Sequence, residues 1–199
     1  MAGIAAVSVA FVGADALRAV GSGLAVPGVC LAVGLVVFAA AWRGGTPTEL
    51  CGLGKAALVA GALAAVGSAV EIAGVAQLLG LDWVGAVRDG HVSGPMLRLV
   101  GAGLIVVGLF EGVAVGEAPG GGARWSLAGS PALSIAGVPV AVVSFAFDGR
   151  TATVGPRVAH ALVSVAHAGA ASVWVGAAAA VAGLAWWRRG GRAGGSPTL

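Results

Sequence analysis

The sequence has little charge: only 10% of its 199 residues are Asp, Glu, Lys or Arg, against 58% hydrophobic residues. A soluble domain carries about 25% charged residues to keep its surface in water. Here 11 basic and 8 acidic residues fall in short clusters between long apolar runs, which excludes a soluble enzyme and a disordered chain. The net charge of +3 is spread over loops, which excludes a nucleic-acid-binding protein. These proportions indicate an integral membrane protein that lies in a lipid bilayer.

Cysteine and catalytic motifs are also scarce. Cys30 and Cys51 are the two cysteines, and no C-x-x-C pair occurs, which argues against a disulfide framework. The sequence has no G-x-S-x-G motif, P-loop or dinucleotide fingerprint, and the glycine run at 120–122 follows no predicted strand. No three metal ligands are spaced closely enough to activate a water molecule. We therefore expect no enzyme activity.

The long apolar runs predict an all-α, polytopic transmembrane helix bundle. About 20 apolar residues in a helix cover the roughly 30 Å of a bilayer's hydrocarbon core. Six runs meet this need, at residues 3–20, 24–42, 53–81, 94–116, 127–147 and 157–187. Residues 1–187 thus form one transmembrane domain, and 188–199 a basic, glycine-rich tail. No Lys or Arg precedes the first run, so we interpret it as a retained helix, with a cleaved signal peptide as the alternative.

Lys and Arg residues in short loops predict the orientation of the bundle. Six spans place one set of basic residues on the side of the tail: Arg43, Lys55, Arg124, Arg188, Arg189 and Arg192. The opposite side receives the remaining set: Arg18, Arg88, Arg98, Arg150 and Arg157. The three arginines of the tail are the densest cluster, so we expect both the C-terminus and the N-terminus to be cytoplasmic.

Most of the unusual side chains fall in the outer half of this predicted bundle. Glu71 and His167 lie about 14 Å below the outer ends of their spans, at 1.5 Å per residue. His91 falls in an outer loop, Met96 in the first turn of the fourth span, and His160 near the start of the last span. An ionisable residue inside a span is costly and is a candidate for function. We expect Glu71 and His167 to converge on a shared, wet pocket, with His91, Met96 and His160 at its outer face.

Copper is the metal that this set of side chains suits. Imidazole binds copper in either oxidation state, and thioether sulfur favours Cu(I). His160 and His167 are about 10 Å apart on one helix face, too far for one ion but suited to successive ligands, with Glu71 or Met96 supplied by neighbouring helices. The alternative for Glu71 and His167 is a structural role, such as an imidazole hydrogen-bonded to a backbone carbonyl. The alternative for His91 and His160 is a solvated surface position, and for Met96 a packing role.

Three short motifs suggest a family. The run from His167 to Gly176 has a histidine, small residues and then Trp174-Val-Gly176. It resembles the signature helix of the copper resistance protein D (CopD) family, in which a histidine and small residues precede W-x-G-G. Residues 147–153, Phe-Asp-Gly-Arg-Thr-Ala-Thr, are similar to that family's G-H-[TA]-A loop. Residues 93–99, Ser-Gly-Pro-Met-Leu-Arg-Leu, are similar to its F-G-x-x-x-x-R-L helix start. The resemblance covers roughly residues 59–184 and identifies a divergent and short member.

The resemblance implies copper handling at the inner membrane, with movement of copper from periplasm to cytoplasm. It implies a periplasmic copper-binding protein or other membrane subunits as partners, and a packing role in the signature helix for Trp174 and Gly176. Arg150 stands where the family usually has histidine, and Ala177 replaces the second glycine of W-x-G-G. Family members also commonly continue with further helices.

Two other functions fit the sequence. A structural or assembly subunit is suggested by Gly112 and Gly116, whose G-x-x-x-G spacing favours close helix pairing. A b-type haem electron carrier needs two axial histidines on facing helices. His160 and His167 share one predicted helix, so only His91, in a loop, could complete such a pair.

Overall fold

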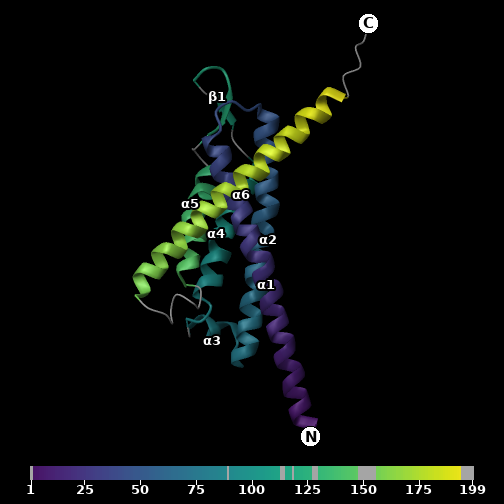
Figure 1. Cartoon of the computed structure of the whole chain (residues 1–199), viewed down its shortest axis with the longest axis vertical. Helices are drawn as coiled ribbons and strands as arrows, with labels where there is room; N and C mark the ends of the chain where they lie inside the picture. The colour runs from purple at the N-terminus through teal and green to yellow at the C-terminus, as the bar shows by residue number, and fades with distance from the viewer. Residues whose placement is uncertain are drawn as a thin grey trace.

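The computed structural model describes residues 2–88, 90–112, 115–117, 119–126, 130–147 and 156–193. Helices make up most of this part of the chain (Figure 1). In order, the elements are α1 (Ala2–Ala41), α2 (Pro47–Leu79), α3 (Trp83–Arg88), α4 (Ser93–Phe110), β1 (Val115–Glu117), β2 (Ala123–Trp125), α5 (Ser130–Val143), the 3-10 helix η1 (Ser144–Phe147) and α6 (Arg157–Ala193).

The long helices pack side by side around α1. It contacts α2 along most of its length, and α6 crosses it; α4 lies between α2 and α5. The start of α1 and the end of α6 lie at opposite ends of the molecule, and the β1–β2 hairpin lies at the end where α6 finishes (Figure 1). The two ends of the bundle are therefore distinct.

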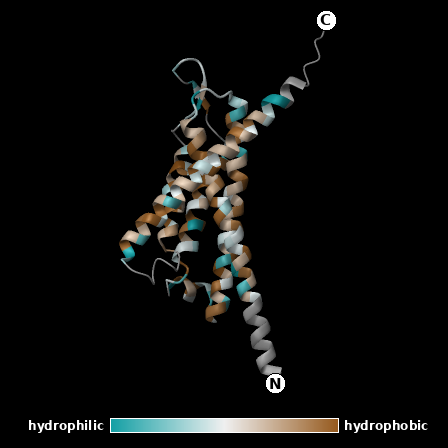
Figure 2. Ribbon diagram, in the orientation of Figure 1, coloured by the Kyte–Doolittle hydropathy of each residue, from teal (hydrophilic) through white to brown (hydrophobic). Residues whose placement is uncertain are grey.

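Among the residues that the structure describes, four helical segments are long and apolar enough to cross a membrane. They are Gly13–Ala41, Pro47–Leu79, Ser93–Phe110 and Arg157–Arg189. A shorter apolar helix covers Pro131–Phe147. The long helices are mostly brown and white when coloured by hydropathy (Figure 2). The prediction of a helical bundle of the membrane type is therefore confirmed.

The expected spans at 3–20 and 24–42 form one continuous helix, α1, so the prediction of two spans here is wrong. A Gly-Ser-Gly run between apolar stretches is typical of a turn in a soluble protein. In α1, Gly21 instead faces α2, where an added Cβ would overlap the backbone nitrogen of Glu71. A glycine inside a membrane helix lets a neighbouring backbone approach closely and need not end the helix.

The expected span at 94–116 is also shorter in the structure. Helix α4 ends at Phe110, and Gly112 follows with φ +90°. Val115–Glu117 then pairs antiparallel with Ala123–Trp125, so the last residues of this expected span belong to a hairpin. Gly112 and Gly116 therefore do not lie on a helix, and their G-x-x-x-G spacing supplies no helix-pairing face.

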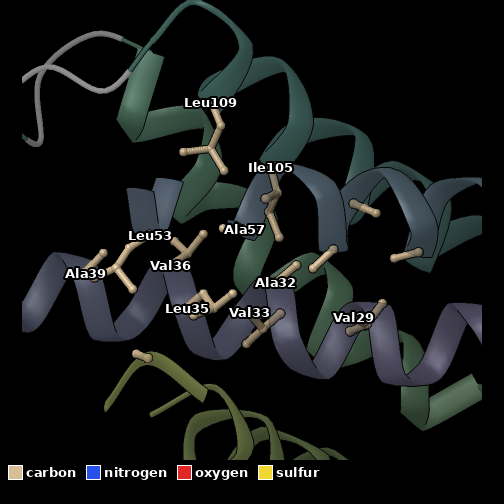
Figure 3. Close-up of a cluster of buried hydrophobic side chains, with 14 of the residues drawn as sticks. Val29, Ala32, Val33, Leu35, Val36, Ala39, Leu53, Ala57, Ile105 and Leu109 are labelled. Carbon is tan, nitrogen blue, oxygen red and sulfur yellow. The ribbon is translucent and has the colours of Figure 1, made fainter. Parts of the chain in front are cut away.

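The central core joins α1 to α2, α4 and α6. In Figure 3, buried side chains of α1 point toward Leu53 and Ala57 of α2 and toward Ile105 and Leu109 of α4. Ala180 and Leu184 of α6 belong to the same cluster. Lipid tails are as apolar as these side chains, so their contribution to stability is close van der Waals packing rather than removal of apolar area from water.

Two glycines allow α6 to cross α1 closely. A Cβ at Gly34 of α1 would overlap the carbonyl oxygen of Ser172, and a Cβ at Gly176 of α6 would overlap the backbone of Gly34. Ser172 is fully buried and donates a hydrogen bond of 2.7 Å to the carbonyl oxygen of Ala168 in its own helix. The backbones are thus in direct contact, which fixes where α6 meets the bundle.

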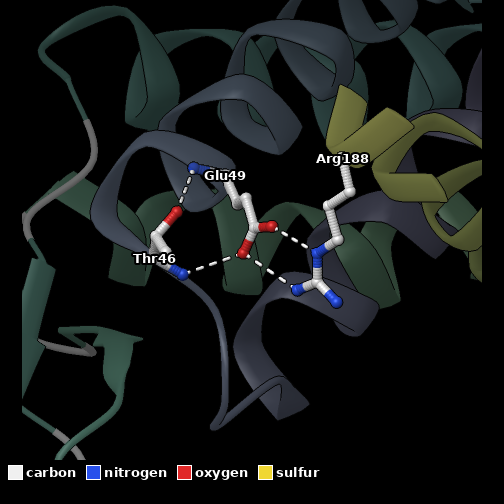
Figure 4. Close-up of polar contacts among 3 residues, drawn as sticks. All are labelled: Thr46, Glu49 and Arg188. Atoms are coloured by element: carbon white, nitrogen blue, oxygen red, sulfur yellow. Dashed lines mark hydrogen bonds and ion pairs between the residues drawn. The ribbon is translucent and has the colours of Figure 1, made fainter. Parts of the chain in front are cut away.

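A capped helix start ties α2 to the end of α6 (Figure 4). Thr46 and Glu49 form a capping box: the Thr46 side chain accepts from the Glu49 backbone N–H at 3.2 Å, and the Glu49 carboxylate accepts from the Thr46 N–H at 2.9 Å. Arg188 Nε donates to Glu49 Oε1 at 2.7 Å. The expected tail at 188–199 begins inside α6, which continues to Ala193; residues 194–199 lie outside the described part.

Candidate functional site

A partly open cavity of about 1100 Å³ lies between α1, α2, α4, η1 and α6. We call it the polar cavity, because five of its lining residues are titratable groups with charged or imidazole side chains: Asp15, Arg18, Glu71, Arg98 and His167. The others are Ala19, Ser22, Val26, Cys30, Phe145, Ser164, Ala168 and Ala171.

Helix geometry explains why these residues share one cavity. The lining residues of α1 recur every three or four positions from Asp15 to Cys30, so they form one helical face. The lining residues of α6, from Ser164 to Ala171, follow the same spacing. Both faces carry mainly small residues, which leaves open space where α1 and α6 diverge from their close crossing at Gly34.

A buried ion pair forms part of the cavity wall. Arg98 Nη1 of α4 lies 3.4 Å from Glu71 Oε2 of α2, and the two side chains are 2% and 11% exposed. The Arg98 guanidinium also lies over the Phe145 ring, 5.5 Å from its centroid. A charge at this depth is retained only when it is paired, so the two residues hold α2, α4 and η1 together as well as lining the cavity.

Glu71 and His167 line the same cavity, as the sequence predicts for a shared pocket. Their environments differ. The carboxylate of Glu71 is buried and paired with Arg98, whereas His167 is exposed. The imidazole is therefore the group that is more accessible to a solute entering the cavity.

The other three predicted copper ligands lie elsewhere. His91 lines a second, smaller cavity of about 270 Å³, to which Arg18 and Glu71 also contribute. Met96 packs against a separate hydrophobic cluster that contains Ile72 and Val92. His160 is exposed on α6 and is not a lining residue of either cavity.

The structure does not gather the predicted ligands around one ion. Within the described part of the chain, no group of three or more His, Cys, Asp or Glu residues could hold a metal ion. His91 and His167 line different cavities, so they do not face each other across one space as the axial ligands of a haem do. Hydropathy and spacing indicate the depth of a side chain, but not the direction in which it points from its helix.

Glu71 and His167 are the two cavity residues that the sequence predicts as site residues, and Arg98 and Cys30 are among the lining residues that it missed. The orientation prediction counts Arg98 only as a basic residue of the outer side, yet it is the largest fully buried side chain among the described residues. Two features of the sequence could have indicated this ion pair: Arg98 lies in the second turn of α4, and Glu71 lies at a similar depth in α2. Cys30 falls in an apolar run of the sequence, but it lines the cavity beside α6.

Asp15 and Arg18, three residues apart on one helix, are spaced to pair with each other. No ion pair joins them among the residues that the structure describes, and both are exposed where they line the polar cavity. A carboxylate, a guanidinium and the imidazole of His167 therefore surround a space that a small polar or charged solute could occupy.

The residues of the family resemblance are placed as follows. Gly176 packs against Gly34, whereas Trp174, expected to pack in the signature helix, is 76% exposed on the outside of α6. Arg150 lies outside the described residues.

No protein-family model, curated protein or solved structure matches this chain.

Proposed function

We propose that this chain is a multi-pass membrane protein that binds a small charged solute in the polar cavity and passes it across the bilayer. The observation that carries the proposal is that Asp15, Arg18, Glu71, Arg98 and His167 line one cavity inside an otherwise apolar helix bundle. Ionisable residues within membrane-spanning helices face cavities or one another because lipid cannot solvate them, and such residues mark solute pathways.

Five passes are the topology that we propose for this bundle. Ser130 to Phe147 comprises 14 helical and four 3-10 residues, which together extend about 29 Å and match the hydrocarbon core. The basic residues stay on the two sides of the membrane predicted from the sequence, because joining the first two spans changes only the side on which α1 starts. We propose that the bundle lies in the inner membrane. The end with Arg43, Arg124 and Arg188 then faces the cytoplasm, and the start of α1 lies on the opposite side.

Copper is the solute that we propose, on the basis of the resemblance and of His167. Arg98 already neutralises Glu71, so the softer groups of the cavity, the His167 imidazole and the Cys30 thiol, are the better candidates to meet the ion. Thiolate sulfur selects Cu(I), and imidazole accepts both oxidation states. His91, Met96 and His160 have no part in this proposal.

The experiment compares two histidines of the same helix. Purified wild-type protein, His167→Ala and His160→Ala are equilibrated with Cu(I) under reducing conditions, and bound copper is measured by mass spectrometry. Wild type and His160→Ala are expected to retain copper, and His167→Ala to lose it. Uptake of copper into proteoliposomes is expected to follow the same order.

Three results would count against copper: no bound metal in wild type, equal loss in both variants, or uptake unaffected by His167→Ala. In the first case, the cavity would serve a different solute, and thermal stabilisation of the protein by candidate ions would identify it.

A structural or assembly subunit is the second candidate, and the exposure of α6 favours it. In the most apolar stretch of α6, 28% of the residues are buried, against 50% in α1. The uncovered face includes Trp174 and Val181. A stoichiometric partner subunit after mild detergent extraction, together with no bound copper, would favour this function over transport.

A further inference from the structure

A separate, apolar groove of about 720 Å³ lies between α1, α2 and α6. Leu24 and Leu63, at one end of it, are 40% and 49% exposed. Lys55, Gly52 and Trp187 lie at the other end, where the Trp187 ring packs over Gly52. The groove shares no lining residue with the polar cavity, so a ligand bound in it is independent of the proposed function.

The dimensions of the groove match one lipid chain. Along α1 it extends from Gly23 to Leu35, about 18 Å at 1.5 Å per residue. One leaflet contributes roughly 15 Å of hydrocarbon. A helix of that length and about 10 Å across would occupy roughly 1400 Å³, about twice the volume of the groove. A flexible acyl chain therefore fits this space better than a partner helix.

Charge distinguishes the two ends of the groove. Among the described residues, Lys55 is its single charged lining residue. Helix α2 is about 50 Å long, whereas the hydrocarbon core is about 30 Å thick. If the helix is centred in the bilayer, about 10 Å of it extends beyond the core on each side, and Lys55 lies close to the headgroup boundary. Trp187, at the same end, is a residue type that prefers this boundary. The ammonium group can therefore reach a lipid phosphate while the rest of the groove remains in hydrocarbon.

We infer that this groove, which we call the lipid groove, binds one phospholipid with an anionic headgroup. Its acyl chain lies between Leu24, Leu63 and Gly183, and its phosphate contacts Lys55. The apolar wall supplies dispersion contact with the chain, and the single cation selects the headgroup.

The first test concerns headgroup selection. Full-length protein is placed in nanodiscs of phosphatidylcholine containing phosphatidylglycerol as the minor lipid, and retained lipid is measured by native mass spectrometry. Wild type is expected to retain one phosphatidylglycerol, and Lys55→Gln to retain about fivefold less. Arg189→Gln, which removes an exposed cation near the same end of the bundle but outside the groove, is expected to match wild type.

The second test fills the groove. A Cβ at Gly183 meets open space, so Gly183→Leu places a bulky side chain in the groove without a backbone clash. It is expected to lose the retained lipid, at least tenfold. Gly103→Leu is the matched control, because Gly103 of α4 also has open space around it and does not line the groove.

Two results would overturn the inference. One is that wild type and Lys55→Gln each retain phosphatidylglycerol and phosphatidylcholine equally. The other is a bound polypeptide, rather than a lipid, that Gly183→Leu displaces and Gly103→Leu does not.

Discussion

Glu71 of α2 and Arg98 of α4 form an ion pair across 3.4 Å, and both side chains are almost completely buried in the apolar bundle. A single charge would be unstable at this depth, because the free-energy cost of its desolvation exceeds the stabilisation that packing of the helices provides. Their pairing explains how two charges persist at this depth. It also leaves His167 as the more accessible titratable group opposite them in the polar cavity.

Removal of one partner of this pair is expected to destabilise the bundle. Glu71→Gln leaves the guanidinium of Arg98 without its carboxylate, and we expect a loss of about 3 kcal/mol in the free energy of unfolding. Titration with SDS, followed by circular dichroism, measures this loss.

The double variant separates pairing from packing. Glu71→Leu combined with Arg98→Met replaces both charges by apolar groups of similar size, and we expect stability within about 1 kcal/mol of wild type. A Glu71→Gln variant as stable as wild type would show that the ion pair does not hold α2 against α4.

The capping box at the start of α2 gives a second prediction. Thr46→Ala removes the oxygen that accepts from the Glu49 backbone N–H and is expected to cost about 1 kcal/mol in unfolding free energy. Thr48→Ala is the control, since Thr48 is exposed in the first turn and is not the N-cap. Equal effects of the two substitutions would mean that the cap contributes nothing specific.

The contact of α6 with α1 gives a third prediction. Gly176→Val forces a side chain into the backbone of Gly34, and we expect a loss of more than about 3 kcal/mol or failure to fold, since backbone atoms cannot move aside. Gly183→Val, in the same helix with open space around it, is expected to change stability by less than about 1 kcal/mol. Size-exclusion chromatography and SDS titration compare the two. Similar behaviour of both variants would contradict this close crossing.

Much of the bundle is predictable from hydropathy alone. The spans expected at 53–81 and 157–187 correspond to Pro47–Leu79 and Arg157–Ala193, because a long apolar run leaves few alternatives in lipid. The continuity of α1 through residues 21–23 was not predictable. A glycine has the same sequence signature in a turn as in a helix contact, and only the neighbour of Gly21 on α2 distinguishes the two.

The candidate site was predictable only in part, for a similar reason. The depths of Glu71 and His167 follow from counting residues along a helix, and both side chains do line one cavity. The direction of Met96 and the partner of Glu71 depend on how α4 is rotated against α2. That rotation is set by tertiary packing, which the periodicity of either helix alone does not determine.

The accessibility of Cys30 tests the polar cavity most directly. Cys30 lies about 18 Å along α1 from Arg18, at the deep end of the cavity, and Cys51→Ser leaves it as the sole cysteine. In vesicles of known orientation, we predict that a membrane-impermeant thiol reagent labels Cys30 from the side of Arg18 and that bound copper slows the labelling. A cysteine at Val107, exposed on the lipid-facing side of α4, is the control in a chain without Cys30 and Cys51. Labelling of Cys30 no faster than this control, or only from the side of Arg188, would contradict a water-filled cavity inside the bundle.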